Sequence, residues 1–251
     1  MKSMWEIRQQ ADPSTLDLYI YGDVEPDGYD FWTDEAVRSE TSANTFRAEL
    51  DARPDVRQIN IYINSYGGSV FKGTAIYNQL KRHPAHKTVY IDGFACSVAS
   101  VIAMAGDEIV MPRNALMMVH NMWMYAQGNA AELRKAADDL DKINEAGRAA
   151  YLEKAGDKLT PEMIAEHEDG ETWLTAEECI SYGLADRYAD QDADMSGAAE
   201  VLKKANLNLE QRIQVQTSLA AQLRNLVAGH ESDAKPAGKS NHIYTLLGGK
   251  Q

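Results

Sequence analysis

The sequence lacks the long apolar runs that membrane insertion requires. No stretch approaches the 18 consecutive apolar residues of a membrane-spanning helix, and Met1–Gln10 is too polar for a signal peptide. Cysteine is scarce: Cys96 and Cys179 lie in apolar segments, which is typical of reduced thiols rather than of a disulfide framework. These absences predict a protein that stays in the cytoplasm where it is made and has no membrane partner.

Positive charge is also in short supply. The 251 residues include 25 Lys and Arg against 38 Asp and Glu, which gives a formal net charge of −13. Because phosphate backbones are bound by clustered Lys and Arg, this balance argues against DNA or RNA as a partner. The hydrophobic content of 44% is that of a soluble globular chain, and the length suffices for one sizeable α/β core.

Strand-like and helix-like segments alternate along the first two-thirds of the chain. The predicted strands are short and rich in β-branched residues: Leu16–Tyr21, Ile59–Ile63, Thr88–Ile91, Glu108–Met111 and Ala115–Val119. The predicted helices between them have apolar residues at helical spacing: Ser42–Ala52, Val70–Arg82 and Val98–Ala105. This alternation predicts an α/β fold with a mostly parallel sheet.

A second group of helices follows. Ala130–Ala155 predicts a long helix with a narrow apolar stripe, which is expected to project or to pack against another subunit. Thr160-Pro161 predicts a helix start, and Thr175-Ala176-Glu177-Glu178 is a capping box with Gly183 as the stop. We therefore expect an N-terminal segment (1–15), a single α/β domain (16–190), a helical extension (191–229) and a disordered tail (230–251).

Three loops of this fold are expected at the carboxyl ends of the parallel strands, where reactive groups of α/β proteins collect. They are Asn64–Ser69, Gly93–Ser97 and His120-Asn121. A serine hydroxyl that attacks an acyl group needs a base, and the imidazole of His120 could take the proton from Ser97. The N–H groups of Gly68 and Val98 could bind the oxyanion. A carboxylate to orient the histidine is available in the acidic run Glu166–Glu171.

Each of these features also has an ordinary structural interpretation. A serine at a helix start commonly caps the helix, a Gly-Gly pair is commonly a turn, and an acidic run is commonly a solvated helix end. The G-x-S-x-G elbow is absent, because Gly93 lies four positions before Ser97. Cys96 is expected to be a small buried residue, since apolar surroundings raise a thiol pKa. Tyr66-Gly67-Gly68 lacks the Lys-Ser/Thr ending of a phosphate-binding loop.

Taken in order, the motifs resemble those of the Clp protease proteolytic subunit. The matching segments are Asn64-Ser65-Tyr66-Gly67-Gly68, Gly93-Phe94-Ala95-Cys96-Ser97, Met118-Val119-His120, Glu171-Thr172-Trp173-Leu174-Thr175-Ala176-Glu177-Glu178 and Tyr182-Gly183-Leu184-Ala185-Asp186. The resemblance implies a serine endopeptidase with Ser97 as nucleophile, His120 as general base and Gly68 and Val98 as oxyanion hole. It places the catalytic acid at Glu171, where the family usually has Asp, with Asp169 as the alternative.

The resemblance also implies an architecture and partners. The family fold is a crotonase-like α/β spiral of βαβ units, in which the long helix is a handle that joins two seven-membered rings. Protein or peptide is the substrate, an ATP-driven AAA+ unfoldase is a frequent partner, and the chemistry calls for no metal and no cofactor. The Glu-Thr-Trp-Leu-Thr-Ala-Glu-Glu variant and the C-terminal extension resemble the phage and prophage branch, whose members process capsid or scaffold proteins during head maturation in a bacterial host.

Two other functions are compatible with the same fold. A crotonase-type acyl-CoA enzyme would use a similar oxyanion hole but has no use for a serine–histidine pair. A non-enzymatic, ring-forming assembly protein would keep the fold and the C-terminal helix without turning over substrate. The set Ser97, His120 and Glu171 favours the peptidase.

Overall fold

A computed structural model describes residues 5–9, 12–25, 28–30, 35–37 and 42–191. The strands are β1 (Trp5–Gln9), β2 (Thr15–Val24), β3 (Gly28–Asp30), β4 (Glu35–Val37), β5 (Gln58–Gly68), β6 (His86–Cys96), β7 (Glu108–Met111), β8 (Leu116–Val119), β9 (Thr172–Thr175) and β10 (Arg187–Tyr188). The helices are α1 (Ala43–Asp51), α2 (Val70–Arg82), α3 (Val98–Ala103), α4 (Ala130–Ala155), the 3₁₀ turn η1 (Gly156–Lys158), α5 (Pro161–Asp169) and α6 (Ala176–Ser181). The predicted α/β class is confirmed.

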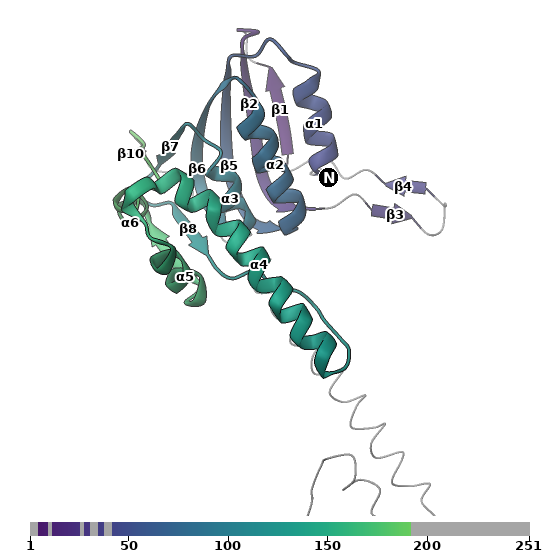
Figure 1. Cartoon of the computed structure of the whole chain (residues 1–251). Coiled ribbons are helices and arrows are strands. Elements are labelled where there is room, and N and C mark those ends of the chain that lie inside the picture. Colours follow the sequence, from purple (N-terminus) through teal and green to yellow (C-terminus); the bar gives the residue numbers. More distant parts are fainter. Residues whose placement is uncertain (1–4, 10–11, 26–27, 31–34, 38–41, 192–251) are drawn as a thin grey trace, which may run out of the picture. The chain divides into compact units, whose positions relative to one another are not determined.

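One sheet organises these elements. Its strands follow the order β1-β2-β5-β6-β7-β10, while β8 pairs with β6 and β9 pairs with β8 (Figure 1). Strands β2, β5, β6, β7 and β8 are parallel to their neighbours in this group, whereas β1 and β9 are antiparallel. Strand β6 changes partner along its length: Thr88–Tyr90 pairs with β7, and Phe94–Cys96 pairs with β8. The carboxyl ends of β6 and β8 therefore lie side by side.

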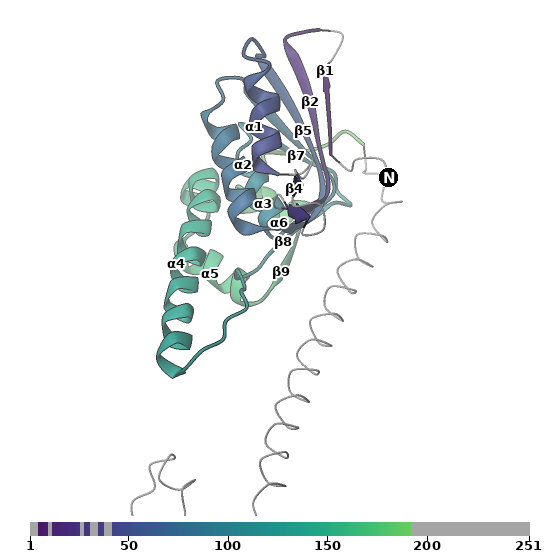
Figure 2. The same cartoon turned by 90° about the vertical axis from the view of Figure 1, so that its right-hand side faces the viewer.

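Alternation of side chains decides which face of the sheet the helices cover. Along β5, Ile59, Ile61 and Ile63 are buried, and the residues between them are partly exposed. Figure 2 shows α1 and α2 on one side of the strands. On a strand, alternate residues face opposite sides, so Tyr62 faces away from the isoleucines; its ring stacks between those of Tyr19 and Tyr90 at centroid distances of 4.7 and 5.1 Å.

Helices α2 and α3 pack closely because α2 has a glycine at the contact. A Cβ atom on Gly73 would run into the side chain of Val98 at the start of α3. Every residue of α3 is buried, in agreement with its almost wholly apolar sequence. This close packing fixes the position of the helix that follows Ser97.

The long helix α4 matches the predicted range Ala130–Ala155. It begins with a capping box formed by Asn129 and Glu132, whose side chains bond to each other's backbone N–H groups. Its first half is largely exposed, and its buried residues lie from Asn144 onward. Figures 1 and 2 both show the N-terminal half of α4 extending past the strands, as the projecting helix was expected to do.

Several sequence-based boundaries were wrong. Strand β5 continues through Asn64 to Gly68, and β6 continues through Gly93 to Cys96, so two of the three expected loops are irregular strand ends with register shifts. Strands β1, β3, β4 and β10 were not predicted: β3, β4 and β10 are too short to show a periodic pattern, and β1 lies in the polar N-terminal segment, where no strand was expected. The predicted helical extension and disordered tail fall on residues that, apart from Gln191, lie outside those described. Within the described ranges, no helix has the length and apolar character needed to cross a membrane.

Candidate active site

The serine and histidine singled out by sequence come together at the ends of adjacent parallel strands. Strand β6 ends at Cys96, which pairs with Met118 of β8, and the Ser97 N–H donates to the carbonyl of Met118 at 2.9 Å. This register places the next residues of both strands at one edge. The Ser97 hydroxyl Oγ lies 2.8 Å from His120 Nε2, a hydrogen-bond distance. Two side chains that are 23 positions apart in the sequence are thus held within hydrogen-bond distance of each other.

The backbone of Ser97 is in a conformation that a serine rarely adopts. Its φ is 54° and its ψ is −132°, whereas L-residues other than glycine strongly prefer negative φ. Such a conformation costs on the order of 1–3 kcal/mol, and strained residues cluster at active sites. Ser97 occupies the N-cap position of α3, but its hydroxyl bonds to His120 instead of capping the helix. The alternative interpretation of Ser97 as a structural cap is therefore wrong.

The Gly-Gly pair at the end of β5 lies directly against Ser97. Gly67 has a φ of 101°, and a Cβ atom there would lie 2.7 Å from Ser97 Cβ and 2.8 Å from the Cys96 carbonyl oxygen. Gly68 has a φ of 140° and lies against the backbone of Val24. Ser65 fixes this segment, because its hydroxyl donates to the Gly22 carbonyl and accepts from the Gly67 N–H at 3.1 Å. Only glycine fits both positions without displacing a neighbour.

The two candidate acids lie just before β9, which pairs with the edge of β8 opposite to the one that pairs with β6. Strands β8 and β9 are antiparallel, and their pairing ends at Val119 and Thr172; His120 directly follows Val119, and Glu171 directly precedes Thr172. Glu171 has an exposed side chain and a φ of 47°. Asp169 is engaged elsewhere: its Oδ1 accepts a hydrogen bond from the Asn121 side-chain amide at 2.6 Å. Both acidic residues are therefore linked to the segment that contains His120: Glu171 through the pairing of β9 with β8, and Asp169 through its hydrogen bond with Asn121.

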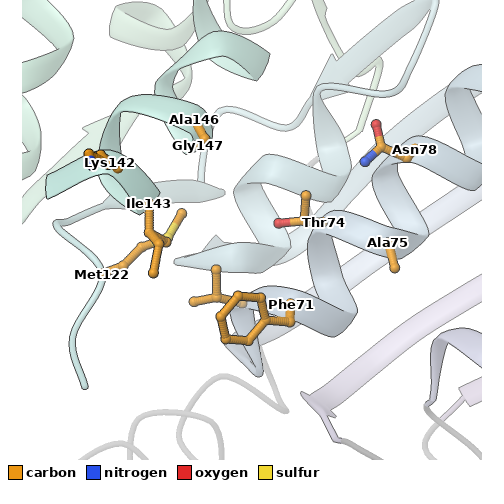
Figure 3. Close-up of a pocket in the computed structure, with 10 residues that line it drawn as sticks. Phe71, Thr74, Ala75, Asn78, Met122, Lys142, Ile143, Ala146 and Gly147 are labelled. Atoms are coloured by element: carbon orange, nitrogen blue, oxygen red, sulfur yellow. The ribbon is translucent and has the colours of Figure 1, made fainter. Parts of the chain in front are cut away.

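A pocket of about 410 Å³ adjoins this edge and was not anticipated from the sequence. Its walls come from α2, from α4 and from Met122, two residues after His120; Figure 3 shows the labelled side chains. Most of them are apolar, including Phe71, Met122 and Ile143. Gly147 lets Met122 approach α4, since a Cβ atom at that position would collide with the Met122 methyl group. The signal in the sequence was weak, because these residues share no local pattern.

Cys96, the neighbouring thiol, has a different environment. It is fully buried, and burial raises the pKa of its thiol far above the ordinary range. A thiol that stays protonated at neutral pH is a poor nucleophile. The expectation that Cys96 is a small buried residue is confirmed.

Comparisons with known proteins agree with this geometry. The family model for Clp protease matches residues 35–192, more than half of the chain. The chain belongs to the Clp protease family. Members of this family are serine-type peptidases, so the chain is a hydrolase of that type, and the resemblance noted in the sequence is confirmed.

Individual Clp protease relatives support the same assignment. The chain is 33% identical over 166 residues to the ATP-dependent Clp protease proteolytic subunit 3 of Streptomyces coelicolor, which covers 64% of this chain and 75% of that protein. It is 31% identical over 149 residues to the proteolytic subunit 3 of Rhodococcus jostii, covering 59% and 73%. The proteolytic subunit of Ligilactobacillus salivarius is 33% identical over 140 residues, covering 55% and 70%.

Proposed function

We propose that this Clp family protein cleaves polypeptides through an acyl-enzyme, with Ser97 as nucleophile and His120 as general base. The observation that carries the proposal is the 2.8 Å contact between Ser97 Oγ and His120 Nε2. His120 removes the hydroxyl proton as Oγ attacks the scissile carbonyl carbon, and it returns that proton to the leaving amine. Water then hydrolyses the ester. A crotonase-type acyl-CoA enzyme has no need of this contact, which disfavours that alternative.

The oxyanion hole of the proposed mechanism consists of the backbone N–H groups of Gly68 and Val98. Gly68 belongs to the strand end that packs against Val24, and Val98 directly follows the nucleophile. Both groups belong to rigid, well-packed segments, which is the property that stabilisation of a developing negative charge requires. The ψ of −132° at Ser97 sets the direction of the Val98 N–H relative to the Ser97 side chain.

We assign the catalytic acid to Glu171. Extension of the antiparallel register of β8 and β9 by one pair beyond Val119–Thr172 would set Glu171 opposite His120. Directly opposite residues of antiparallel strands have Cβ atoms about 5 Å apart, a gap that a glutamate side chain can span. Asp169 is the weaker candidate because the Asn121 amide already occupies one of its oxygens.

Substrate and partner expectations follow from the pocket, the long helix and the family. The mostly apolar pocket beside Met122 would accept an apolar side chain next to the scissile bond. The exposed half of α4, which includes Leu133, supports a homo-oligomeric ring joined through this helix. We propose an AAA+ unfoldase or a capsid protein as the partner. We propose the cytoplasm as the location, because Cys96 and Cys179 are both free thiols, which suits a reducing compartment.

The decisive experiment compares the wild-type protein with Ser97→Ala. The wild type should be labelled by a fluorophosphonate probe at Ser97, as mapped by peptide mass spectrometry, and should degrade an unfolded protein such as reduced casein. The variant should lose both activities while its native mass and circular dichroism spectrum stay unchanged. Labelling that survives in Ser97→Ala would refute the assignment. Absence of both activities in the wild type would favour a non-enzymatic assembly protein.

The acid assignment has its own test. Glu171→Gln should lower kcat on a short fluorogenic peptide by about 10³- to 10⁴-fold, the cost of losing a triad acid, with little change in stability. Asp169→Asn is the matched control, since it also removes one negative charge from the same segment, and it should lower kcat far less. The reverse order of the two effects would transfer the role to Asp169.

A further inference from the structure

Three polar side chains on one face of α4 bond to the segments that carry the proposed catalytic residues. Asn144, Arg148 and Tyr151 are spaced four and three residues apart, so they share a face of the helix. Asn144 and Tyr151 are buried, and the Arg148 side chain is 23% exposed. The first half of α4 is largely exposed, so this face is confined to the half that packs against the sheet domain.

On the side of the base, α4 holds the two residues after His120. The Met122 N–H donates to Asn144 Oδ1 at 2.8 Å, and the Arg148 Nη2 donates to Asn121 Oδ1 at 3.2 Å. Asn121 is covalently adjacent to His120. A shift of its side chain would therefore rotate the backbone from which the imidazole extends.

On the side of the acid, the same arginine holds the end of α5. The Arg148 Nε forms an ion pair with Glu168, which is only 4% exposed. The Glu168 carbonyl accepts the N–H groups of both Asn121 and Glu171, each at 3.2 Å. The Asn121 amide in turn donates to Asp169 at 2.6 Å. Asn121 is thus the point where the base segment, the acid segment and α4 meet.

On the side of the nucleophile, Tyr151 contacts α3, the helix that follows Ser97. Its hydroxyl bonds to Ser100 Oγ at 2.7 Å, and Ser100 Oγ donates to the Ser97 carbonyl at 2.5 Å. Since Ser100 uses its one proton on that carbonyl, Tyr151 is the donor in the first bond. One helix face therefore contacts all three segments of the proposed triad.

Stability alone does not explain the ion pair between Arg148 and Glu168, because burial of the Glu168 charge costs free energy. Burial raises the pKa of Glu168, and the Arg148 guanidinium opposes that rise without cancelling it. Well-packed apolar residues often replace a buried ion pair at no loss of stability. The planar guanidinium, however, can bond Glu168 and Asn121 at the same time through separate nitrogens, and neither an apolar side chain nor a lysine can do so.

We propose that Arg148 is a positioning residue that acts through Asn121. It sets the distance between His120 and the segment Glu168–Glu171, and it does not contact the substrate. The inference rests on the proposed peptidase function, because it assumes that His120 is the base. It assigns the base geometry to the long helix, so a movement of α4 would displace Asn121 and with it His120.

The test is a double-mutant cycle on the full-length protein with Arg148→Lys and Asn121→Ala. Arg148→Lys keeps the charge beside Glu168 but cannot occupy both nitrogen positions, and Asn121→Ala leaves no buried charge behind. Each should lower kcat on a short fluorogenic peptide by about 10- to 100-fold, the range expected for a misplacement of up to 1 Å, with KM changed less than twofold. The combined variant should be no slower than the slower single variant, because both changes break one connection.

Arg134→Lys is the matched control, since Arg134 is exposed on the first half of the same helix, where its guanidinium donates to the Ala130 carbonyl one turn earlier. It should leave kcat unchanged. Full activity of Asn121→Ala, or a combined loss equal to the product of the single losses, would overturn the inference. Fluorophosphonate labelling distinguishes failure of the proposed function from failure of the role of Arg148. A wild-type protein that is not labelled at Ser97 would refute the proposed function. Wild-type labelling rates in both single variants would refute only the positioning role of Arg148.

Discussion

Replacement of Gly67 by alanine tests how tightly the nucleophile is held. The new Cβ atom would lie 2.7 Å from Ser97 Cβ, whereas ordinary contacts begin at 3.4 Å, so the two must separate by about 0.7 Å. The neighbours cannot yield easily, because the other close atom is the Cys96 carbonyl oxygen of a buried strand. The alanine must also keep a φ of 101°, which costs on the order of 1–3 kcal/mol.

A displacement of this size matters more for catalysis than for stability. Misplacement of a reacting group by about 1 Å lowers a rate by about 100-fold, so Gly67→Ala should lower kcat by about 10- to 100-fold. The Ser97 Oγ to His120 Nε2 distance, 2.8 Å in the native protein, would leave the hydrogen-bonding range if the whole shift fell along it. The assay is kcat on a fluorogenic peptide together with the rate of fluorophosphonate labelling.

Gly156→Ala provides the control for backbone strain. Gly156 also has a positive φ, 59°, but nothing lies within 4 Å of the position its Cβ would take. Gly156→Ala should lose on the order of 1–3 kcal/mol of stability, because its φ of 59° with a ψ of −133° is a conformation that residues other than glycine rarely adopt, and it should keep the wild-type labelling rate. If Gly67→Ala were labelled and turned over peptide within twofold of wild type, the claim that this strand end holds Ser97 in place would be refuted.

Two further predictions concern stability. Gly73→Ala should destabilise the protein by about 1–3 kcal/mol, because the new Cβ atom would meet the Val98 side chain. Adding Val98→Ala should recover part of this loss. Urea denaturation of the wild type, the two single variants and the double variant measures the coupling between the two sites, and a coupling of zero would contradict the prediction. Asp107→Asn should cost about 0.5 kcal/mol at pH 7, because the Asp107 side chain is 44% exposed and solvent screens its ion pair with Lys87. Partial burial raises the pKa of Asp107, but hydrogen bonds and charge from Lys87 outweigh it and hold that pKa below its usual value. The stabilisation is therefore present above the unfolded pKa of about 3.9 and lost as pH falls through the lower folded pKa, so the two proteins should converge in thermal unfolding below about pH 4; a constant difference would contradict this.

The two halves of α4 have different surroundings: the first half is largely exposed, and the second half packs against the sheet domain. Its exposed half is available to a partner, while its buried half carries Asn144, Arg148 and Tyr151 to the proposed catalytic segments. Contact with a partner at one end could therefore influence the geometry at the other. The proposed cycle with Arg148 and Asn121 measures the final step of this connection.

Local sequence was sufficient to define most of the regular elements. Helices α2 and α4 and strand β7 have the predicted limits, because apolar periodicity and capping residues act within a few positions of one another. The same reasoning placed Ser97 and His120 at strand ends and therefore at one edge of a parallel sheet. The motif order then indicated the family, which the comparisons confirmed.

Tertiary structure alone decided how those residues meet. The exchange of partners along β6, the positive φ of Ser97 and the pairing of β8 with β9, which ends at Val119 and Thr172, depend on contacts between segments far apart in the chain. The bonds from Arg148 to Asn121 and Glu168 span 27 and 20 residues, and no local periodicity encodes them. A pattern of neighbouring residues specifies which face of an element is buried, but only the folded chain specifies which other element it is buried against.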